Sequence, residues 1–354
     1  INSKGEIEKK AKTFWRDFNP TEGEVPAEDG GNVALGGLED QVASPDDRKI
    51  FTDKGDFVVT NTSVIAEIKK VLKNHNGVDA SDQDAKEMID WIRGIENRNG
   101  DEVVLRNHIL GDALHSKPAA ITYGDAGNST KDSTYLIFGT NAGFVHFFED
   151  TSETVATEVW SFIPTELFNI QPSLKDNVPG KVYGMDLTPT IYHDDKNGDG
   201  KVNAGEDVWA FFVMRRGGSS YYALNISDRS NPKLLWQKSS SSTGYGNLGQ
   251  TWSQPKVIYI NHPTYSEQPM LVFGAGYDKQ QYENGAANTV GAGIYLVDAK
   301  TGDVVWSTDK ISFDGTDSIV GRIATLDTDY DGYTDRLYAA DTGGKIWRVD
   351  LAGS

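Results

Sequence analysis

The sequence predicts a mainly β protein, a β-propeller with a few short N-terminal helices. Three observations favour this fold class. A unit of four short strands repeats, a tryptophan ends the fourth strand of three units, and aspartate-rich loops stand at the same place in two units. Pro118, Pro189 and Pro255 mark the first strands of three units and lie 71 and 66 residues apart. A β-solenoid would need shorter coils, and a β-sandwich would not repeat this pattern.

Residues 1–100 are predicted to form an irregular and helical segment that packs on the propeller. Residues 1–60 are polar and rich in glycine and aspartate, and we expect them to be mostly irregular, with one short helix at about residues 7–18. Apolar residues then recur at helical spacing over 63–72 and 82–97, and Ser81 offers an N-cap for the second helix. We expect both apolar faces to be packing surfaces.

Residues 101–354 are predicted to form the propeller blades, with one order of strands in every unit. The first strand usually carries a proline, the second is apolar, the third follows a glycine turn, and the fourth ends in tryptophan. The expected strands are 116–122, 135–138, 144–148 and one ending at Trp160; 187–192, 209–213, 221–225 and one ending at Trp236; 253–259, 270–273, 294–298 and one ending at Trp306; and 321–325, 336–339 and 346–350. The fourth unit reaches residue 354 without its tryptophan strand, so we expect a ring that is modified or incomplete in this fragment.

The run Asp327-Thr-Asp-Tyr-Asp-Gly-Tyr-Thr-Asp335 concentrates acids in a way that core packing does not require. Like charges this close repel one another unless a cation neutralises them, and calcium accepts several oxygen ligands from carboxylates and carbonyls. Gly332 permits the sharp turn that would wrap the ion. We predict a calcium site, and the alternative is a solvated acidic turn. The predicted ligands are the side chains of Asp327, Asp329, Asp331 and Asp335 and the carbonyl of Tyr333.

A second loop, Asp195-Lys-Asn-Gly-Asp-Gly-Lys-Val-Asn-Ala-Gly-Glu206, matches the EF-hand loop at its key positions. Its flanks have the composition of strands and not of helices, so we predict a calcium-filled loop between two strands instead of a helix-opening sensor. His193, next to Asp194, could assist this metal loop, but we expect it to be a solvent-exposed turn residue. The predicted ligands are Asp195, Asn197, Asp199, the carbonyl of Lys201, Asn203 and Glu206.

Composition narrows the classes of function. The chain has 354 residues and a formal net charge of −18, from 52 acidic and 34 basic residues. Such a surface repels nucleic-acid backbones and anionic membranes, and no membrane-spanning segment is visible, so we expect neither nucleic-acid binding nor membrane insertion. The absence of cysteine excludes disulfides, thiolate catalysis and cysteine-ligated zinc. Calcium loops suit an extracellular location, and a chain that opens on Ile1 is expected to be a fragment of a longer protein.

The segment Ile294-Tyr-Leu-Val-Asp-Ala-Lys-Thr-Gly-Asp-Val-Val-Trp306 is similar to the blade motif of quinoprotein-like propellers. Over about residues 85–354, the chain resembles the C-terminal propeller of the PilC/PilY family of type IV pilus tip-associated adhesins. The family's calcium loop matches this sequence over residues 327–335, whereas the loop at 195–206 is not a feature of the whole family. The resemblance rests on segments that occur in the family's order, at 90–94, 110–118, 138–148, 162–168, 217–225, 248–255 and 327–351.

The resemblance implies a secreted bacterial protein at the pilus tip or cell surface, acting in pilus assembly, retraction and surface adhesion. Its implied partners are pilin or minor pilins, and a host or abiotic surface bound through regions outside this fragment. Two alternatives stay open, a calcium-stabilised extracellular binding module of the lectin or integrin type and a quinone-dependent dehydrogenase. Those dehydrogenases draw calcium ligands from several blades, whereas these ligands are contiguous, and catalytic motifs are missing. We therefore expect no enzyme, no catalytic residue and no organic cofactor.

Overall fold

The described part of the chain forms two compact units in the computed structural model. The first unit comprises Ile1–Ala113 and Ala120–Val182, and the second comprises Leu114–Ala119 and Tyr183–Ser354. The division expected at residue 100 stays a prediction, and the helix expected at 7–18 lies, apart from residue 15, outside the described residues. The structure describes residues 4, 15, 37–39, 41–99, 102–124, 132–152, 155–280, 285, 289–308 and 314–351.

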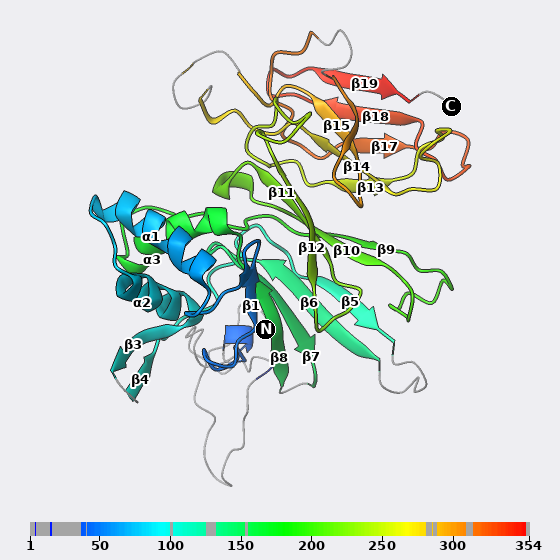
Figure 1. Ribbon diagram of the computed structural model, residues 1–354. Coiled ribbons are helices and arrows are strands. Elements are labelled where there is room, and N and C mark those ends of the chain that lie inside the picture. The colour runs from blue at the N-terminus through cyan, green and yellow to red at the C-terminus, as the bar shows by residue number, and fades with distance from the viewer. Residues whose placement is uncertain are drawn as a thin grey trace. The chain divides into compact units, whose positions relative to one another are not determined.

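The first unit contains a six-stranded sheet in the order β2-β1-β8-β7-β6-β5 (Figure 1). Four strands follow one another in sequence as the predicted first blade: β5 (Ala119–Tyr123), β6 (Ser133–Gly139), β7 (Val145–Asp150) and β8 (Ala156–Phe162). Trp160 lies in β8 and stacks on Phe147 of β7, with ring centroids 4.7 Å apart. This blade therefore forms where the strand pattern predicts it.

Two strands from the N-terminal region extend this blade, which the sequence did not predict. They are β1 (Ile50–Thr52), parallel to β8, and β2 (Gly55–Asp56), antiparallel to β1. Behind this pairing, Arg48 forms two bonds with Glu158, at 2.7 Å and 2.8 Å. The expectation of irregular structure is therefore wrong at residues 50–56.

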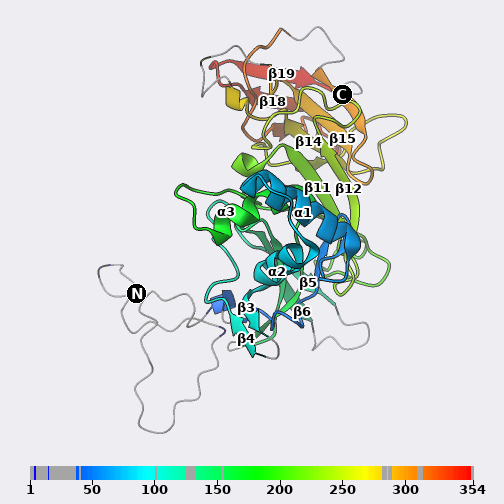
Figure 2. The ribbon, with the colours of Figure 1, turned by 60° about the vertical axis from the view of Figure 1, so that its left-hand side comes forward.

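Helices α1 (Thr62–Asn76) and α2 (Asp82–Arg93) lie beside the short helix α3 (Gln171–Lys175), as Figures 1 and 2 show. The apolar face of α1 buries Val64, Ile65, Ile68 and Leu72, and Ser81 caps α2 in a capping box. The second helix ends earlier than expected because Gly94 takes φ 121°, and the chain continues as the hairpin β3 (Ile95–Asn99) and β4 (Glu102–Leu105). The described residues also include the short 3₁₀ helices η2 (Gly37–Glu39), η3 (Thr165–Ile170) and η4 (Arg215–Gly217).

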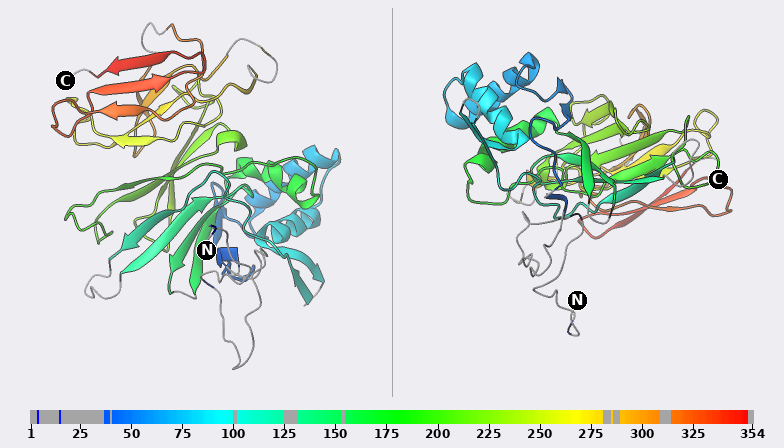
Figure 3. Two further views of the ribbon diagram at one scale, coloured as in Figure 1. Left: turned by 180° about the vertical axis from the view of Figure 1, so that it is seen from behind. Right: turned by 90° about the horizontal axis from the view of Figure 1, so that it is seen from below.

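The second unit contains three antiparallel sheets whose strands are adjacent in sequence order, as in propeller blades. Figure 3 shows the last of them from two further directions. The first sheet holds β9 (Thr190–His193), β10 (Val208–Val213), β11 (Ser220–Asn225) and β12 (Lys233–Ser239). The second holds β13 (Lys256–Ile258), β14 (Met270–Gly274), β15 (Ile294–Asp298) and β16 (Val304–Ser307), and the third holds β17 (Ala324–Leu326), β18 (Arg336–Ala340) and β19 (Ile346–Asp350). The predicted fold class is confirmed, and each of these sheets is open.

Large aromatic side chains pack the sheets of the second unit against one another. Tyr221 of β11 stacks on Phe273 of β14, with centroids 4.2 Å apart, inside one buried cluster. Trp236 of β12 reaches the neighbouring sheet and donates its indole N–H to the carbonyl oxygen of Ala299 at 3.0 Å. The inner strands are thereby fixed, and the loops at their ends start from rigid positions.

Candidate metal centres

Both predicted loops join the first and second strands of their sheets. The loop at 195–206 lies between β9 and β10, where His193 pairs with Val208. The loop at 327–335 lies between β17 and β18, where Leu326 pairs with Arg336. The two loops therefore occupy equivalent places in two blades, as the repeat predicts.

The first aspartate of each loop organises the backbone behind it. Asp327 accepts the N–H of Tyr330 on Oδ1 at 2.6 Å and that of Gly332 on Oδ2 at 2.9 Å. Asp195 likewise accepts the backbone N–H groups of the residues three and five positions after it. Its Oδ1 accepts the N–H of Gly198 and its Oδ2 that of Gly200, each at 2.8 Å.

The next two predicted ligands of each loop also follow one scheme, in which a side-chain oxygen accepts the N–H two residues later. In the loop at 195–206, Asn197 accepts the N–H of Asp199, and Asp199 accepts that of Lys201. In the loop at 327–335, Asp329 accepts the N–H of Asp331, and Asp331 accepts that of Tyr333. Side chains held this way turn inward over the loop. Two different sequences thus adopt one local structure over seven residues.

The loops differ at their last acid. The buried Asp335 turns its Oδ2 toward Thr328, which donates its backbone N–H at 2.6 Å and its hydroxyl. Glu206 is also buried, and its Oε2 accepts the N–H of Asn203 at 2.8 Å, while its Oε1 accepts the N–H of Lys196 at 3.1 Å. Each closing carboxylate therefore pins the loop onto itself.

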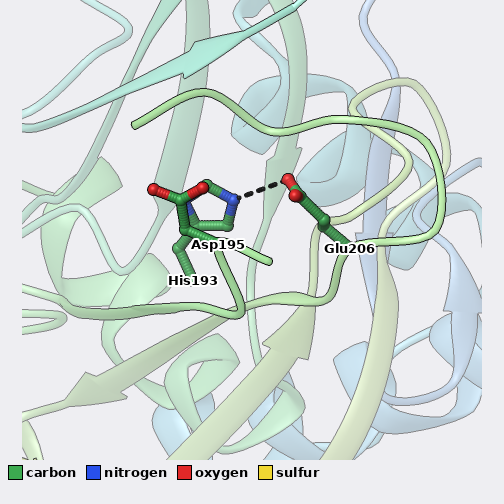
Figure 4. A group of neighbouring side chains, drawn as sticks. All are labelled: His193, Asp195 and Glu206. Carbon is green, nitrogen blue, oxygen red and sulfur yellow. Dashed lines mark hydrogen bonds and ion pairs between the residues drawn. The ribbon is translucent and has the colours of Figure 1, made fainter. Parts of the chain in front are cut away.

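The structure brings together some of the predicted ligands. Asp327, Asp329 and Asp331 each place one carboxylate oxygen within 4.8 Å of the other two. In the second loop, one atom each of Asp195 and Glu206 meets a ring nitrogen of His193 within the same limit (Figure 4). Of the remaining predicted acidic ligands, Asp335 and Asp199 fall outside these two groups. The amide and carbonyl ligands expected from Tyr333, Asn197, Lys201 and Asn203 stay predictions.

His193 was expected to be an exposed turn residue, and this expectation is wrong. It is the last residue of β9, its side chain is only 19% exposed, and its Nε2 lies 3.1 Å from Glu206 Oε2. Thr328 is a residue that the sequence pattern did not single out. Strand alternation could have indicated His193, whereas nothing in the sequence pattern indicates the bond from Thr328 to Asp335.

Electrostatics distinguish the two loops. The N–H of Asp331 lowers the pKa of Asp329, but desolvation and the charges of Asp331, Asp335 and Asp327 outweigh this bond, so the pKa of Asp329 is raised. In the other loop, the pKa of Glu206 is lowered, chiefly by the N–H of Asn203 and against desolvation. Mutual repulsion is therefore concentrated at residues 327–335, where converging aspartate oxygens fit a hard divalent cation.

Fold and loops together define a propeller whose blades carry aspartate-rich loops between their first and second strands. Residues 109–354 match the family described as "PilY1 beta-propeller domain". The chain belongs to this family, and the resemblance to the C-terminal propeller of the PilC/PilY proteins is confirmed.

Two similar proteins are named as type IV pilus biogenesis factors. The chain is 28% identical over 303 residues to the type IV pilus biogenesis factor PilY1 of Pseudomonas aeruginosa (strain UCBPP-PA14), which covers 80% of this chain and 24% of that protein. It is 26% identical over 310 residues to a PilY1 homolog of Xylella fastidiosa (strain Temecula1), covering 80% of this chain and 23% of that protein. The chain thus spans about a quarter of the length of these relatives, which are named as biogenesis factors and not as enzymes.

A solved structure is also similar, the crystal structure of the Pseudomonas aeruginosa PilY1 C-terminal domain. The identity is 23%, the TM-score is 0.44, and the match covers 64% of this chain and 40% of that one. Within the described residues, no helix is long and apolar enough to cross a membrane.

Proposed function

We propose that this chain is the calcium-binding propeller of a secreted type IV pilus protein that acts in pilus assembly, retraction control and surface adhesion. The observation that carries the calcium part is the convergence of the Asp327, Asp329 and Asp331 carboxylates on one hydrogen-bonded loop. Membership of the PilY1 propeller family supports the pilus part.

Calcium supplies the positive charge that lets these carboxylates lie together. Asp327, Asp329 and Asp331 would hold the ion, and Asp335 with the Tyr333 carbonyl would complete the set. The backbone N–H bonds on the outer sides of Asp327 and Asp331 preorganise the loop. The second loop, with Asp195, Asn197, Asp199, Lys201, Asn203 and Glu206 as predicted ligands, is proposed as a second divalent-cation site.

The loop at 327–335 acts as a calcium-dependent switch. With calcium it is compact against β17 and β18; without calcium, the repulsion that raises the pKa of Asp329 loosens it. A pilin or minor pilin at the pilus tip discriminates between the two states. The full protein lies outside the bacterial cell, and regions of it other than this chain bind a host or abiotic surface.

A catalytic role is not proposed. Quinone-dependent propeller enzymes gather calcium and quinone ligands from several blades. Here every predicted ligand of a site comes from one loop between two adjacent strands. This arrangement suits an ion that orders its own loop.

Calorimetric titration with Ca²⁺ after chelator treatment tests the proposal. Two binding events are expected, one lost in Asp335→Ala and the other in Glu206→Ala. Asp303→Asn, which removes an exposed acid outside both loops, should leave both events unchanged. No binding to the wild type at millimolar Ca²⁺ would show that the loops are solvated turns and overturn the calcium function.

The switch has its own test in a bacterium that makes the full protein. Asp327→Lys places an ammonium near the ion's position and favours the calcium-like state, whereas Asp327→Ala favours the empty state. Twitching motility should differ between the two strains. Identical motility would contradict the switch and leave structural calcium intact.

A further inference from the structure

The loop between β9 and β10 has a nitrogen ligand that the loop between β17 and β18 lacks. His193 lies two residues before the first aspartate of its loop, and its Nε2 is 3.1 Å from Glu206 Oε2. The corresponding residue before Asp327 is Thr325, whose hydroxyl accepts a hydrogen bond from Lys256. One loop therefore offers oxygen alone, and the other offers oxygen and imidazole nitrogen.

Strand geometry aims His193 into its loop. Tyr192 packs against Trp209 with ring centroids 4.9 Å apart, so the next side chain points to the opposite face of the sheet. His193 pairs in register with Val208, and Glu206 precedes Val208 by two residues. The two ends of the loop thus bring imidazole and carboxylate together on one side, as Figure 4 shows.

Glu206 is a buried carboxylate whose side-chain partner is the imidazole of His193. Its side chain is 4% exposed, and it pairs with His193. The nearby Lys196 instead directs its ammonium group to the Gly205 carbonyl at 2.6 Å and to Asp194 at 3.6 Å. An imidazole nitrogen, unlike a lysine or arginine side chain, is itself a common metal ligand, so this pair offers a cation one nitrogen and one carboxylate.

The middle of the loop is already occupied by its own hydrogen bonds. Asp199 accepts bonds from the side-chain amides of Asn197 and Asn203, each at 3.2 Å, besides the N–H of Lys201. The carbonyl of Lys201 accepts a bond from Asn203 at 3.0 Å. These EF-hand positions engage one another, while His193, Asp195 and Glu206 converge at the base of the loop.

We propose that His193, Asp195 and Glu206 form a mixed nitrogen–oxygen site for a borderline divalent transition ion of the Zn²⁺ class. Imidazole with two carboxylates suits such an ion and leaves a position for water, whereas calcium prefers oxygen ligands alone. The propeller then carries two loops of one backbone design, and the loop at 195–206, which also takes Ca²⁺, prefers the transition ion. This inference rests on the proposed function in one respect, that the loop at 195–206 holds a divalent cation.

The test is calorimetric titration of the chelator-treated protein with Zn²⁺ alone and Ca²⁺ alone. His193→Gln is the central variant, since its amide N–H can still bond to Glu206 although glutamine is a poor zinc ligand. His75→Gln is the matched control, because His75 also faces a carboxylate, Asp176, at 2.9 Å but without a second acid in a metal-ligating group. We expect His193→Gln to weaken Zn²⁺ binding at least about tenfold and His75→Gln to leave it unchanged.

The loop at 327–335 serves as an internal reference. Asp329→Asn should weaken Ca²⁺ binding and leave Zn²⁺ binding intact. Thermal unfolding of each ion-free variant shows that it is folded. If Zn²⁺ does not bind, or still binds to His193→Gln, the inference is overturned. Loss of Ca²⁺ binding in Asp329→Asn would still support the calcium proposal in that case. Zn²⁺ binding that depends on His193, without Ca²⁺ binding at either loop, would overturn only the calcium proposal.

Discussion

Gly332 donates its backbone N–H to Asp327 Oδ2 at 2.9 Å while holding φ at 92°. A Cβ at this position would meet no atom within 4 Å, so a side chain here brings no clash. The cost of a substitution is therefore that of the left-handed backbone alone, about 1–2 kcal/mol. The bond that orients the first predicted ligand depends on this conformation.

Gly332→Ala is expected to weaken Ca²⁺ binding by up to roughly tenfold, because the ion-free loop relaxes and must regain the strained conformation to bind. Gly344→Ala is the matched control. Gly344 has φ 87° and lies in the turn between β18 and β19, where a Cβ would likewise meet no atom within 4 Å. Without calcium, thermal unfolding should show a smaller loss of stability in Gly332→Ala than in Gly344→Ala, because the ion-free loop at 327–335 relaxes. Calorimetry should show weaker Ca²⁺ binding in Gly332→Ala only.

Asp329→Asn is expected to raise the melting temperature of the ion-free protein and to reduce the further rise that Ca²⁺ causes. The amide oxygen still accepts the N–H of Asp331, while one of the repelling charges is gone. Because the pKa of Asp329 is raised in the folded state, its ionisation disfavours folding as pH rises through that pKa. The stability gap between variant and wild type should therefore open above this pH in chelator and close in acid. A wild-type-sized Ca²⁺ effect in the variant, in scanning calorimetry, would contradict the prediction.

Glu158→Gln is expected to destabilise the first unit by about 3–5 kcal/mol, because it leaves the buried guanidinium of Arg48 without its countercharge. Burial would raise the pKa of Glu158, but Arg48 and a bond from His146 hold this pKa far below its usual range. Glu67→Gln, which breaks an exposed pair with Lys70, should cost less than about 1 kcal/mol. Urea unfolding of both variants measures the difference.

The same cluster predicts loss of stability in acid. Glu158 stabilises the fold above its unfolded pKa of about 4.5, and this contribution falls as pH drops below that value. Burial lowers the pKa of His146 in the folded state. Below about pH 6.5, this histidine is therefore protonated in the unfolded chain before it is protonated in the folded one, which lowers the free energy of unfolding. Unfolding free energy should therefore decline from about pH 6.5 downward, and Glu158→Gln should lack the part below about pH 4.5.

Trp236→Phe is expected to lower the unfolding free energy by about 1–3 kcal/mol, since the buried carbonyl of Ala299 loses its hydrogen bond. Gly302 packs closely here, because a Cβ on it would lie 2.7 Å from the Trp236 ring. Trp306→Phe, at a half-buried tryptophan of the next sheet, should cost less. Circular dichroism during urea unfolding measures both, and equal effects would show that the bond to Ala299 contributes nothing.

Local pattern was enough to predict the blades. Strand β10 is buried at every position, and its run of apolar residues lies between recognisable turns. The same holds for β14. Repetition then reinforced each weak signal, so the tryptophans on β8, β12 and β16 lie where the repeat places them.

Pairings between segments that are distant in the sequence could not be predicted from local residue patterns. Strand β1 is three residues long and joins β8, more than a hundred residues away, without any periodicity to reveal it. In the two aspartate-rich loops, too, some features could be predicted from the local sequence and others could not. Their backbone follows from aspartate and glycine spacing, whereas the approach of His193 to Glu206 and the bond of Thr328 to Asp335 depend on tertiary placement.

The parallel pairing of β1 with β8 has a mechanical consequence. Ile50 lies opposite Ser161 and Phe51 lies opposite Phe162. If the N-terminal end of β1 and the C-terminal end of β8 are pulled apart, the hydrogen bonds between the two strands are loaded together, in shear. Antiparallel neighbours pulled from one end would instead open one bond at a time. Tension applied between the N-terminal segment and the end of β8 would therefore meet a clamp at the pairing of these two strands.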